Sequence, residues 1–108
     1  MRPAILTLVL ATALLAAGCG AVPHLEAGDG DPAAGKKLFV DNCQACHTLA
    51  DAGTQGKVGP NLDDAQPDAA LVVDRVTNGQ GVMPPFSGTL SEQQIADVAA
   101  YVVQATSG

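Results

Sequence analysis

Residues 42–49, with the sequence NCQACHTL, place two cysteines three positions apart and a histidine directly after the second. The three side chains belong to Cys43, Cys46 and His47. Two thiols with a neighbouring imidazole can form a redox dithiol, part of a metal site, or the attachment point of a cofactor. The residues around this motif must decide among the three, because so short a motif is a hypothesis until its context is known.

The composition indicates one small domain that needs a bound group to complete its interior. The chain has 108 residues, of which aromatic residues make up 3%, and it has no Trp. Small domains bury a low fraction of their surface, so a domain this poor in large side chains needs a cofactor or a set of disulfides. Three cysteines cannot make a disulfide framework. The composition therefore favours a cofactor.

The N-terminus has the layout of a bacterial export signal. Arg2 precedes an uncharged apolar run of 16 residues, PAILTLVLATALLAAG, which ends in small residues and is typical of a signal peptide. A transmembrane helix is the alternative, although spanning a bilayer takes about 20 residues. We therefore expect residues 1–18 to direct export, to the periplasm or the outer face of the cytoplasmic membrane.

The end of this signal, LAAGC, resembles the lipobox of bacterial lipoproteins and makes Cys19 the expected lipid attachment site. The match is imperfect, because Ala16 stands where leucine is usual and Leu15 comes one place earlier. Ordinary signal cleavage nearby is the alternative, and it leaves this cysteine discarded or free. Lipidation explains an otherwise odd cysteine in an exported chain. Residues 19–30 would then be a polar tether and residues 31–108 the folded domain.

The charge of the mature chain restricts its partners. Beyond the signal, four basic residues face 11 acidic ones, which gives a net charge of −7. A surface of this sign repels nucleic acid and anionic membranes and steers the protein towards partners with basic docking patches. Solubility alone would also account for it.

Three segments carry the caps and periodicity of helices. Asp31 and Pro32 suit the N-cap and first helical position of the first segment. The second, PDAALVVDRVTNG, stops at Gly79, and the third, LSEQQIADVAAYVV, opens with the capping box of Ser91 and Gln94. The piece between the first two, ADAGTQGKVGPNLDDAQ, is glycine-rich and irregular, and no segment has a strand pattern. The sequence predicts an all-α domain with long loops.

The three interpretations of the cysteine motif can now be compared. A thioredoxin-type dithiol accompanies a βαβ pattern, which is missing here. Structural zinc takes four ligands, and outside the motif only His24 and Cys19 could complete the set, both in poor positions. The spacing C-x-x-C-H is the attachment signature of c-type haem. Cys43 and Cys46 lie on one side of a helical turn and can reach both vinyl groups of a porphyrin, while His47 points the same way towards the iron. We interpret the motif as the attachment site of one haem c.

A second iron ligand can be sought by elimination. Apart from Met1, the chain has one methionine, Met83, which comes 36 residues after His47 in a loop that continues into two prolines. Methionine more often fills gaps in a core, but a position outside any helix suits that role poorly. His24 and Lys57 are weaker candidates. We expect Met83 to bind the iron opposite His47.

From about residue 31 to residue 106 the chain resembles a small class I cytochrome c. The stretches GKKLFVDNCQACH, GPNL, NGQGVMPPF and LSEQQIADVAAYV match family segments in the family's order. The resemblance implies the cytochrome c fold, with three main helices and long loops wrapped around one covalently bound haem. It also implies that the Pro60 carbonyl accepts a hydrogen bond from the haem histidine, and that Tyr101 meets Gly35 and Phe39 where two helices cross, which would explain a glycine inside the first helix.

The expected function is one-electron transfer and not catalysis, because His47 and Met83 together leave the iron no open site. Expected partners are redox proteins of a membrane respiratory chain, namely an electron donor complex and a terminal oxidase or reductase. If Met83 does not bind iron, the alternative is an open-site haem protein such as a peroxidase-like enzyme or a gas sensor. A structural module with an accidental motif is the remaining possibility. The residues expected in the pocket walls, each of which could equally belong to the general core, are Leu62, Val72, Val76, Val82, Phe86 and Ile95.

Overall fold

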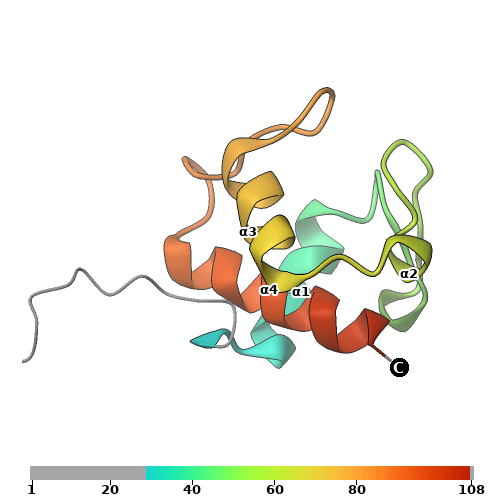
Figure 1. The fold of residues 1–108 in the computed structure, drawn as a ribbon, viewed down its shortest axis with the longest axis horizontal. Coiled ribbons are helices and arrows are strands. Elements are labelled where there is room, and N and C mark those ends of the chain that lie inside the picture. The colour runs from blue at the N-terminus through green and yellow to red at the C-terminus, as the bar shows by residue number, and fades with distance from the viewer. Residues whose placement is uncertain (1–28, 108) are drawn as a thin grey trace, which may run out of the picture.

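Helices dominate the part of the chain that the computed structural model describes, residues 29–107 (Figure 1). The expected signal peptide, Cys19, His24 and most of the expected tether lie outside these residues. Within them, no helix is long and apolar enough to cross a membrane. The elements in chain order are α1 (Pro32–Asn42), β1 (Thr48–Leu49), the 3-10 helix η2 (Ala50–Ala52), β2 (Thr54–Gln55), α2 (Leu62–Ala65), α3 (Ala69–Asn78) and α4 (Glu92–Thr106).

The three expected helices are α1, α3 and α4, and their ends are set by the expected residues. The Asp31 carboxylate accepts a hydrogen bond from the Ala33 N–H at 2.9 Å at the start of α1. Both bonds of the capping box between Ser91 and Gln94 are present at the start of α4. α3 ends where Gly79 takes a φ of 69°, a conformation that favours glycine. The all-α fold class is confirmed.

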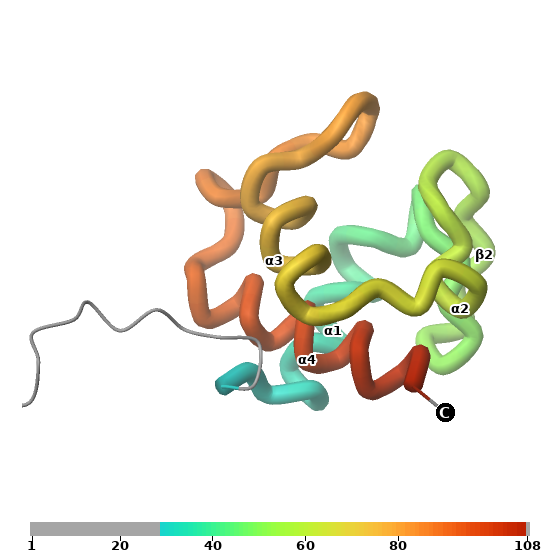
Figure 2. Tube along the Cα trace, viewed as in Figure 1, coloured from blue at the N-terminus to red at the C-terminus, as the bar shows by residue number. Residues whose placement is uncertain are grey.

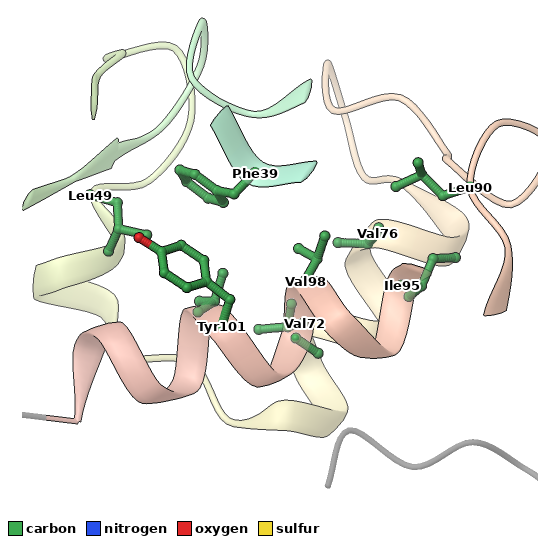
Figure 3. Close-up of a cluster of buried hydrophobic side chains, with 10 residues drawn as sticks. Phe39, Leu49, Val72, Val76, Leu90, Ile95, Val98 and Tyr101 are labelled. Carbon is green, nitrogen blue, oxygen red and sulfur yellow. The ribbon is translucent and has the colours of Figure 1, made fainter. Parts of the chain in front are cut away.

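α1 and α4 cross at very short range, and glycine makes the crossing possible. A Cβ on Gly35 would collide with the carbonyl oxygen of Asp97 and would lie 2.8 Å from the Cβ of Tyr101. One turn along, the rings of Phe39 and Tyr101 pack with centroids 5.9 Å apart and planes inclined by 57° (Figure 3). The expected contact of Tyr101 with Gly35 and Phe39 is therefore present, and it explains the glycine in α1.

The core lies between α4 on one side and α1 and α3 on the other. α3 contributes Val72 and Val76, and α4 contributes Val98 and Val102, all of them buried. These pairs follow the helical spacing of their segments, so one face of each helix turns inward. The complete cluster of buried residues is Phe39, Leu49, Val72, Val76, Leu90, Ile95, Val98, Ala99, Tyr101 and Val102.

The piece between α1 and α3 is more ordered than the sequence indicates. β1 and β2 form a two-stranded antiparallel sheet around η2, with Thr48 opposite Gln55 and Leu49 opposite Thr54. The short helix α2 follows, capped by the Asn61 side chain. Sequence periodicity misses these elements because strands of two residues are shorter than any repeat that could reveal them. The expectation of an irregular segment without strands was wrong here.

Two long loops extend on the same side of the α1–α4 pair (Figure 2). One runs from β1 to α2, and the other follows α3. The second loop is held to its helix by a hydrogen bond from the Phe86 N–H to the Val76 carbonyl at 2.8 Å.

Candidate functional site

A cavity of about 370 Å³ lies between the helices and the two loops. All the residues expected at the site, namely Cys43, Cys46, His47, Pro60 and Met83, line it. They come from the end of α1, the loop before α2 and the loop after α3. The fold therefore brings together groups that lie far apart in the sequence.

The cysteine motif continues α1 by a single turn. The Cys43 N–H donates to the carbonyl of Phe39, at 2.8 Å, as if the helix went on. The N–H groups of Cys46 and His47 then both donate to the Cys43 carbonyl, at 3.2 and 3.1 Å. This turn carries both thiols and the imidazole to the cavity wall, as the spacing predicts.

The two thiols are free and partly buried. Burial, and to a smaller extent the nearby Cys46, raises the pKa of Cys43 to about 11. A thiol with this pKa is protonated at neutral pH, unlike the low-pKa cysteine of a reactive dithiol. Within residues 29–107, no group of three or more His, Cys, Asp or Glu side chains could hold a metal ion. Neither the dithiol nor the zinc interpretation has structural support in this part of the chain.

The imidazole of His47 is buried and oriented. Its Nδ1 lies 2.8 Å from the carbonyl oxygen of Pro60, and a carbonyl can only accept, so Nδ1 carries the proton. Nε2 is then the nitrogen with a lone pair, the form in which histidine binds a metal. The backbone of Gly59 lies against the ring, because a Cβ there would be 2.6 Å from the His47 Cε1. Neighbouring residues therefore fix the position of the His47 imidazole, its tautomer and the orientation of its ring.

Met83 lies in a tight turn that forms part of the cavity wall. Its backbone N–H and carbonyl pair with the carbonyl and N–H of Gln80, both at 3.0 Å. Gly81 takes the first central position of this turn with a φ of 59°, which a side chain would disfavour. Met83 is partly buried against the core. The turn thus presents its thioether to the same cavity as His47.

The cavity walls agree with the expected set except at one residue. Leu62, Val72, Val76, Val82 and Phe86 line the cavity, but Ile95 does not. Ile95 is instead buried in the core at the start of α4, at the end of the cluster away from Phe39 (Figure 3). Its helical spacing predicts burial correctly, but spacing does not say which part of the core a residue enters.

Several wall residues were not anticipated. Phe39 of α1 and Val98 and Val102 of α4 close one side of the cavity. Arg75 of α3 is the single charged side chain lining it in residues 29–107, and its guanidinium contacts Asp74 at 2.7 Å. The position of Arg75 on the cavity wall could have been predicted from the sequence, because this residue follows Val72 by three positions and therefore lies on the same helix face.

The residues present fit a c-type haem. Two free thiols on one turn suit covalent attachment, and the imidazole and the thioether are the pair of ligands that cytochromes c use. The mainly aliphatic and aromatic walls suit a flat apolar ring.

Comparison with known proteins leads to the same family. A family profile described as "Cytochrome C oxidase, cbb3-type, subunit III" matches residues 30–102. Cytochrome c6 of Limnospira maxima is 44% identical over 85 residues, which cover 68% of this chain and 92% of that protein. The cbb3-type oxidase subunit FixP of Bradyrhizobium diazoefficiens is 39% identical over 77 residues, which cover 67% of this chain but only 27% of FixP.

Solved structures give the same result. The c-type cytochrome SorU from Sinorhizobium meliloti superimposes with a TM-score of 0.66 at 44% identity, covering 69% of this chain and 90% of SorU. Cytochrome c6 of the diatom Phaeodactylum tricornutum gives a TM-score of 0.61 at 36% identity, covering 72% of this chain and 97% of that chain. With its fold, its attachment motif and its relatives in agreement, the chain belongs to the small class I cytochromes c, electron carriers with one covalently bound haem c.

Proposed function

We propose that this protein carries single electrons on one haem c that is attached through Cys43 and Cys46 and bound by His47 and Met83. The observation that supports this most strongly is the cavity itself, where two thiols, an oriented imidazole and a thioether line mainly apolar walls. When bound, the iron would alternate between its ferrous and ferric states. The proposal assigns no catalytic step to the chain.

Each residue has a distinct role in this proposal. Cys43 and Cys46 would hold the ring by thioether bonds against the turn that follows α1. His47 would bind the iron through Nε2, because Nδ1 donates to the Pro60 carbonyl at 2.8 Å and that bond makes the imidazole a stronger ligand. The neutral thioether of Met83 and the apolar walls would favour the ferrous state and so raise the reduction potential.

The proposed setting is the exterior of a bacterial cell membrane. Residues 1–18 would direct export, and a lipid on Cys19 would hold the domain at the membrane through its short tether. The partners would be an electron donor complex and a terminal oxidase or reductase of a respiratory chain, with basic patches that complement the acidic surface. The likeness to part of an oxidase subunit, FixP, supports a partner of this kind.

A ligand-binding experiment separates the carrier from an open-site haem protein. Ferrous wild-type protein should bind carbon monoxide weakly, because the gas must displace the Met83 thioether, whereas Met83→Ala should bind it at full strength. Ser87→Ala is the matched control, since Ser87 follows in the same loop, is exposed and does not line the cavity. It should behave like wild type. Full-strength binding of carbon monoxide by the wild-type protein would contradict the proposal and favour a gas sensor or a peroxidase-like enzyme.

The lipid anchor needs its own test in growing cells. Cells fed labelled palmitate should label the wild-type protein and leave Cys19→Ser unlabelled. The mutant should also appear in the soluble periplasmic fraction. Label that persists in the mutant would rule out Cys19 as the attachment site.

A further inference from the structure

Thr54 of β2 is a buried polar residue that neither the attachment motif nor the ligand set explains. It is 6% exposed. Its Oγ1 donates to the carbonyl oxygen of His47 at 2.9 Å and accepts from the N–H of Leu49 at 3.1 Å. A single hydroxyl therefore satisfies two buried backbone groups on either side of Thr48.

The bond to the His47 carbonyl acts on a part of this residue that the Pro60 bond does not reach. Pro60 holds the ring at Nδ1, which sets the rotation of the imidazole. The carbonyl belongs to the peptide that follows His47, and the orientation of that peptide sets the direction of the Cα–Cβ bond. The two bonds thus hold the histidine at both ends.

Other bonds from the same loop stabilise the neighbourhood without touching the His47 carbonyl. The Gly59 N–H donates to the Cys46 carbonyl at 2.7 Å. The hydroxyl of Thr48 donates to the Gly56 carbonyl at 2.9 Å. The chain therefore offers two threonines in one hairpin, each with a hydroxyl bonded across it, of which only Thr54 bonds to the backbone of the histidine.

We propose that Thr54 is a positioning residue for the iron-binding imidazole, because its hydroxyl fixes the peptide that follows His47 and thereby the direction in which the ring enters the cavity. The inference rests on the proposed function, in which His47 binds the iron. Loss of the hydroxyl leaves the backbone of His47 free to tilt while Pro60 still holds Nδ1. The ring then meets the iron at a changed angle.

The experiment compares haem-loaded wild-type protein with Thr54→Val, Thr54→Ser and Thr48→Val. Valine keeps the volume of threonine and removes the hydroxyl, whereas serine keeps the hydroxyl. Proton NMR of the ferric protein reports the His47 ring protons, whose shifts depend on ring orientation at the iron. Amide hydrogen exchange reports the Leu49 N–H. Thr54→Val should move the His47 ring signals and speed Leu49 exchange about tenfold, as expected for loss of one buried hydrogen bond.

The two controls give the remaining expected results. Thr54→Ser should return both readings to wild-type values, and Thr48→Val should leave the His47 ring signals unchanged. The inference is overturned if Thr54→Val speeds Leu49 exchange but leaves the His47 signals in place, since the hydroxyl then stabilises the hairpin alone. It is also overturned if Thr48→Val moves the signals equally. If Thr54→Val does not fold, the same two measurements are made on Thr54→Ala, and the same criteria apply. A wild-type protein without shifted histidine signals contradicts the proposed function itself.

Discussion

The α1–α4 crossing and the hairpin loop of residues 46–60 both supply walls of the site, but they are held in place by different means. At the crossing, close packing fixes the positions of the helices, because Gly35 lets the two backbones approach and Phe39 packs on Tyr101. In the loop, single hydrogen bonds fix the geometry, such as the one from the Thr54 hydroxyl to the His47 carbonyl. Packing is shared among many atoms, whereas each loop bond fixes one particular group.

The two regions are also joined at one point. The hydroxyl of Tyr101 on α4 donates to the Asp51 carboxylate in η2 at 2.5 Å, and the Lys36 ammonium of α1 lies 3.5 Å from the same oxygen. The tip of the hairpin is therefore tied to both helices of the crossing. A change at the crossing should affect overall stability, while a change in the loop should affect the histidine first.

The largest expected effect is at the crossing. Gly35→Ala places a methyl group against the Asp97 carbonyl, so the helices must separate, and we expect a loss of about 3 kcal/mol in the free energy of unfolding. Denaturant unfolding followed by circular dichroism measures it. Gly88→Ala is the control, because a Cβ there meets nothing within 4 Å. Equal stability of the two variants would mean that the close approach does not limit the fold.

The loop should respond differently to an added methyl group. Gly59→Ala places a Cβ 2.6 Å from the His47 Cε1, and we expect a loss of about 2 kcal/mol with a changed ferric absorption spectrum. Lys57→Ala, at an exposed neighbouring position, should change neither the free energy of unfolding nor the ferric spectrum. If Gly59→Ala destabilises the protein but the spectrum stays that of wild type, the glycine serves folding and not the histidine.

A smaller effect is expected where α4 begins. Ser91→Ala removes one half of the capping box and should lower the free energy of unfolding by about 1 kcal/mol. The ferric spectrum should not change, because the cap stabilises the helix and touches no cavity residue. Thermal unfolding of the variant beside Ser87→Ala, an exposed serine outside the helix, measures the difference. A spectral change in Ser91→Ala would show that the crossing and the site are not separable.

The smallest effect concerns the link between the regions, and it depends on pH. Burial, and then the hydrogen bond to Asp51, raises the pKa of Tyr101 well above its usual value. A group whose folded pKa is raised stabilises the fold below its unfolded pKa of about 10, and this stability is lost as pH rises further. Wild-type stability should therefore fall above pH 10 more steeply than that of Tyr101→Phe, as urea unfolding at several pH values will measure. If the stabilities of wild type and Tyr101→Phe fall in parallel as pH rises, this role for Tyr101 is contradicted.

The acid side of the same link has the opposite sign. The hydrogen bond from Tyr101 and the nearby Lys36 lower the pKa of Asp51. A lowered carboxyl pKa stabilises the fold above the unfolded value, and this contribution is lost as pH falls below about 4. Asp51→Asn should therefore lose less stability than wild type between pH 4 and more acid conditions. A steeper loss in the variant would contradict the link.

Much of the crossing could be predicted from the sequence, because hydrophobic periodicity and capping residues indicate where helices lie. Asp31, Ser91 and Gln94 have the expected cap bonds, and the close approach at Gly35, which the family resemblance implied, is present. The cavity residues Cys43, Cys46, His47 and Met83 could be named from their types and spacing, and the structure brings them to one cavity.

The loop could not be predicted in the same way. β1 and β2 have two residues each, and no pattern indicates that the hydroxyl of Thr54 is buried against a histidine backbone. For a related reason the sequence could not decide whether Ile95 lines the cavity or belongs to the core, since periodicity indicates burial and not the neighbour; the structure places it in the core. Contacts that join residues distant in sequence, such as Tyr101 with Asp51, appear only once the chain is folded.

The central claim is that the fold brings His47 and Met83 to one iron from two separate loops. The ferric absorption spectrum of the haem-loaded protein tests it most directly. The wild-type spectrum should contain the charge-transfer band of methionine-bound iron, and Met83→Ala should lose that band while the haem remains covalently attached. A wild-type spectrum without the band, or a Met83→Ala spectrum that keeps it, would contradict the claim.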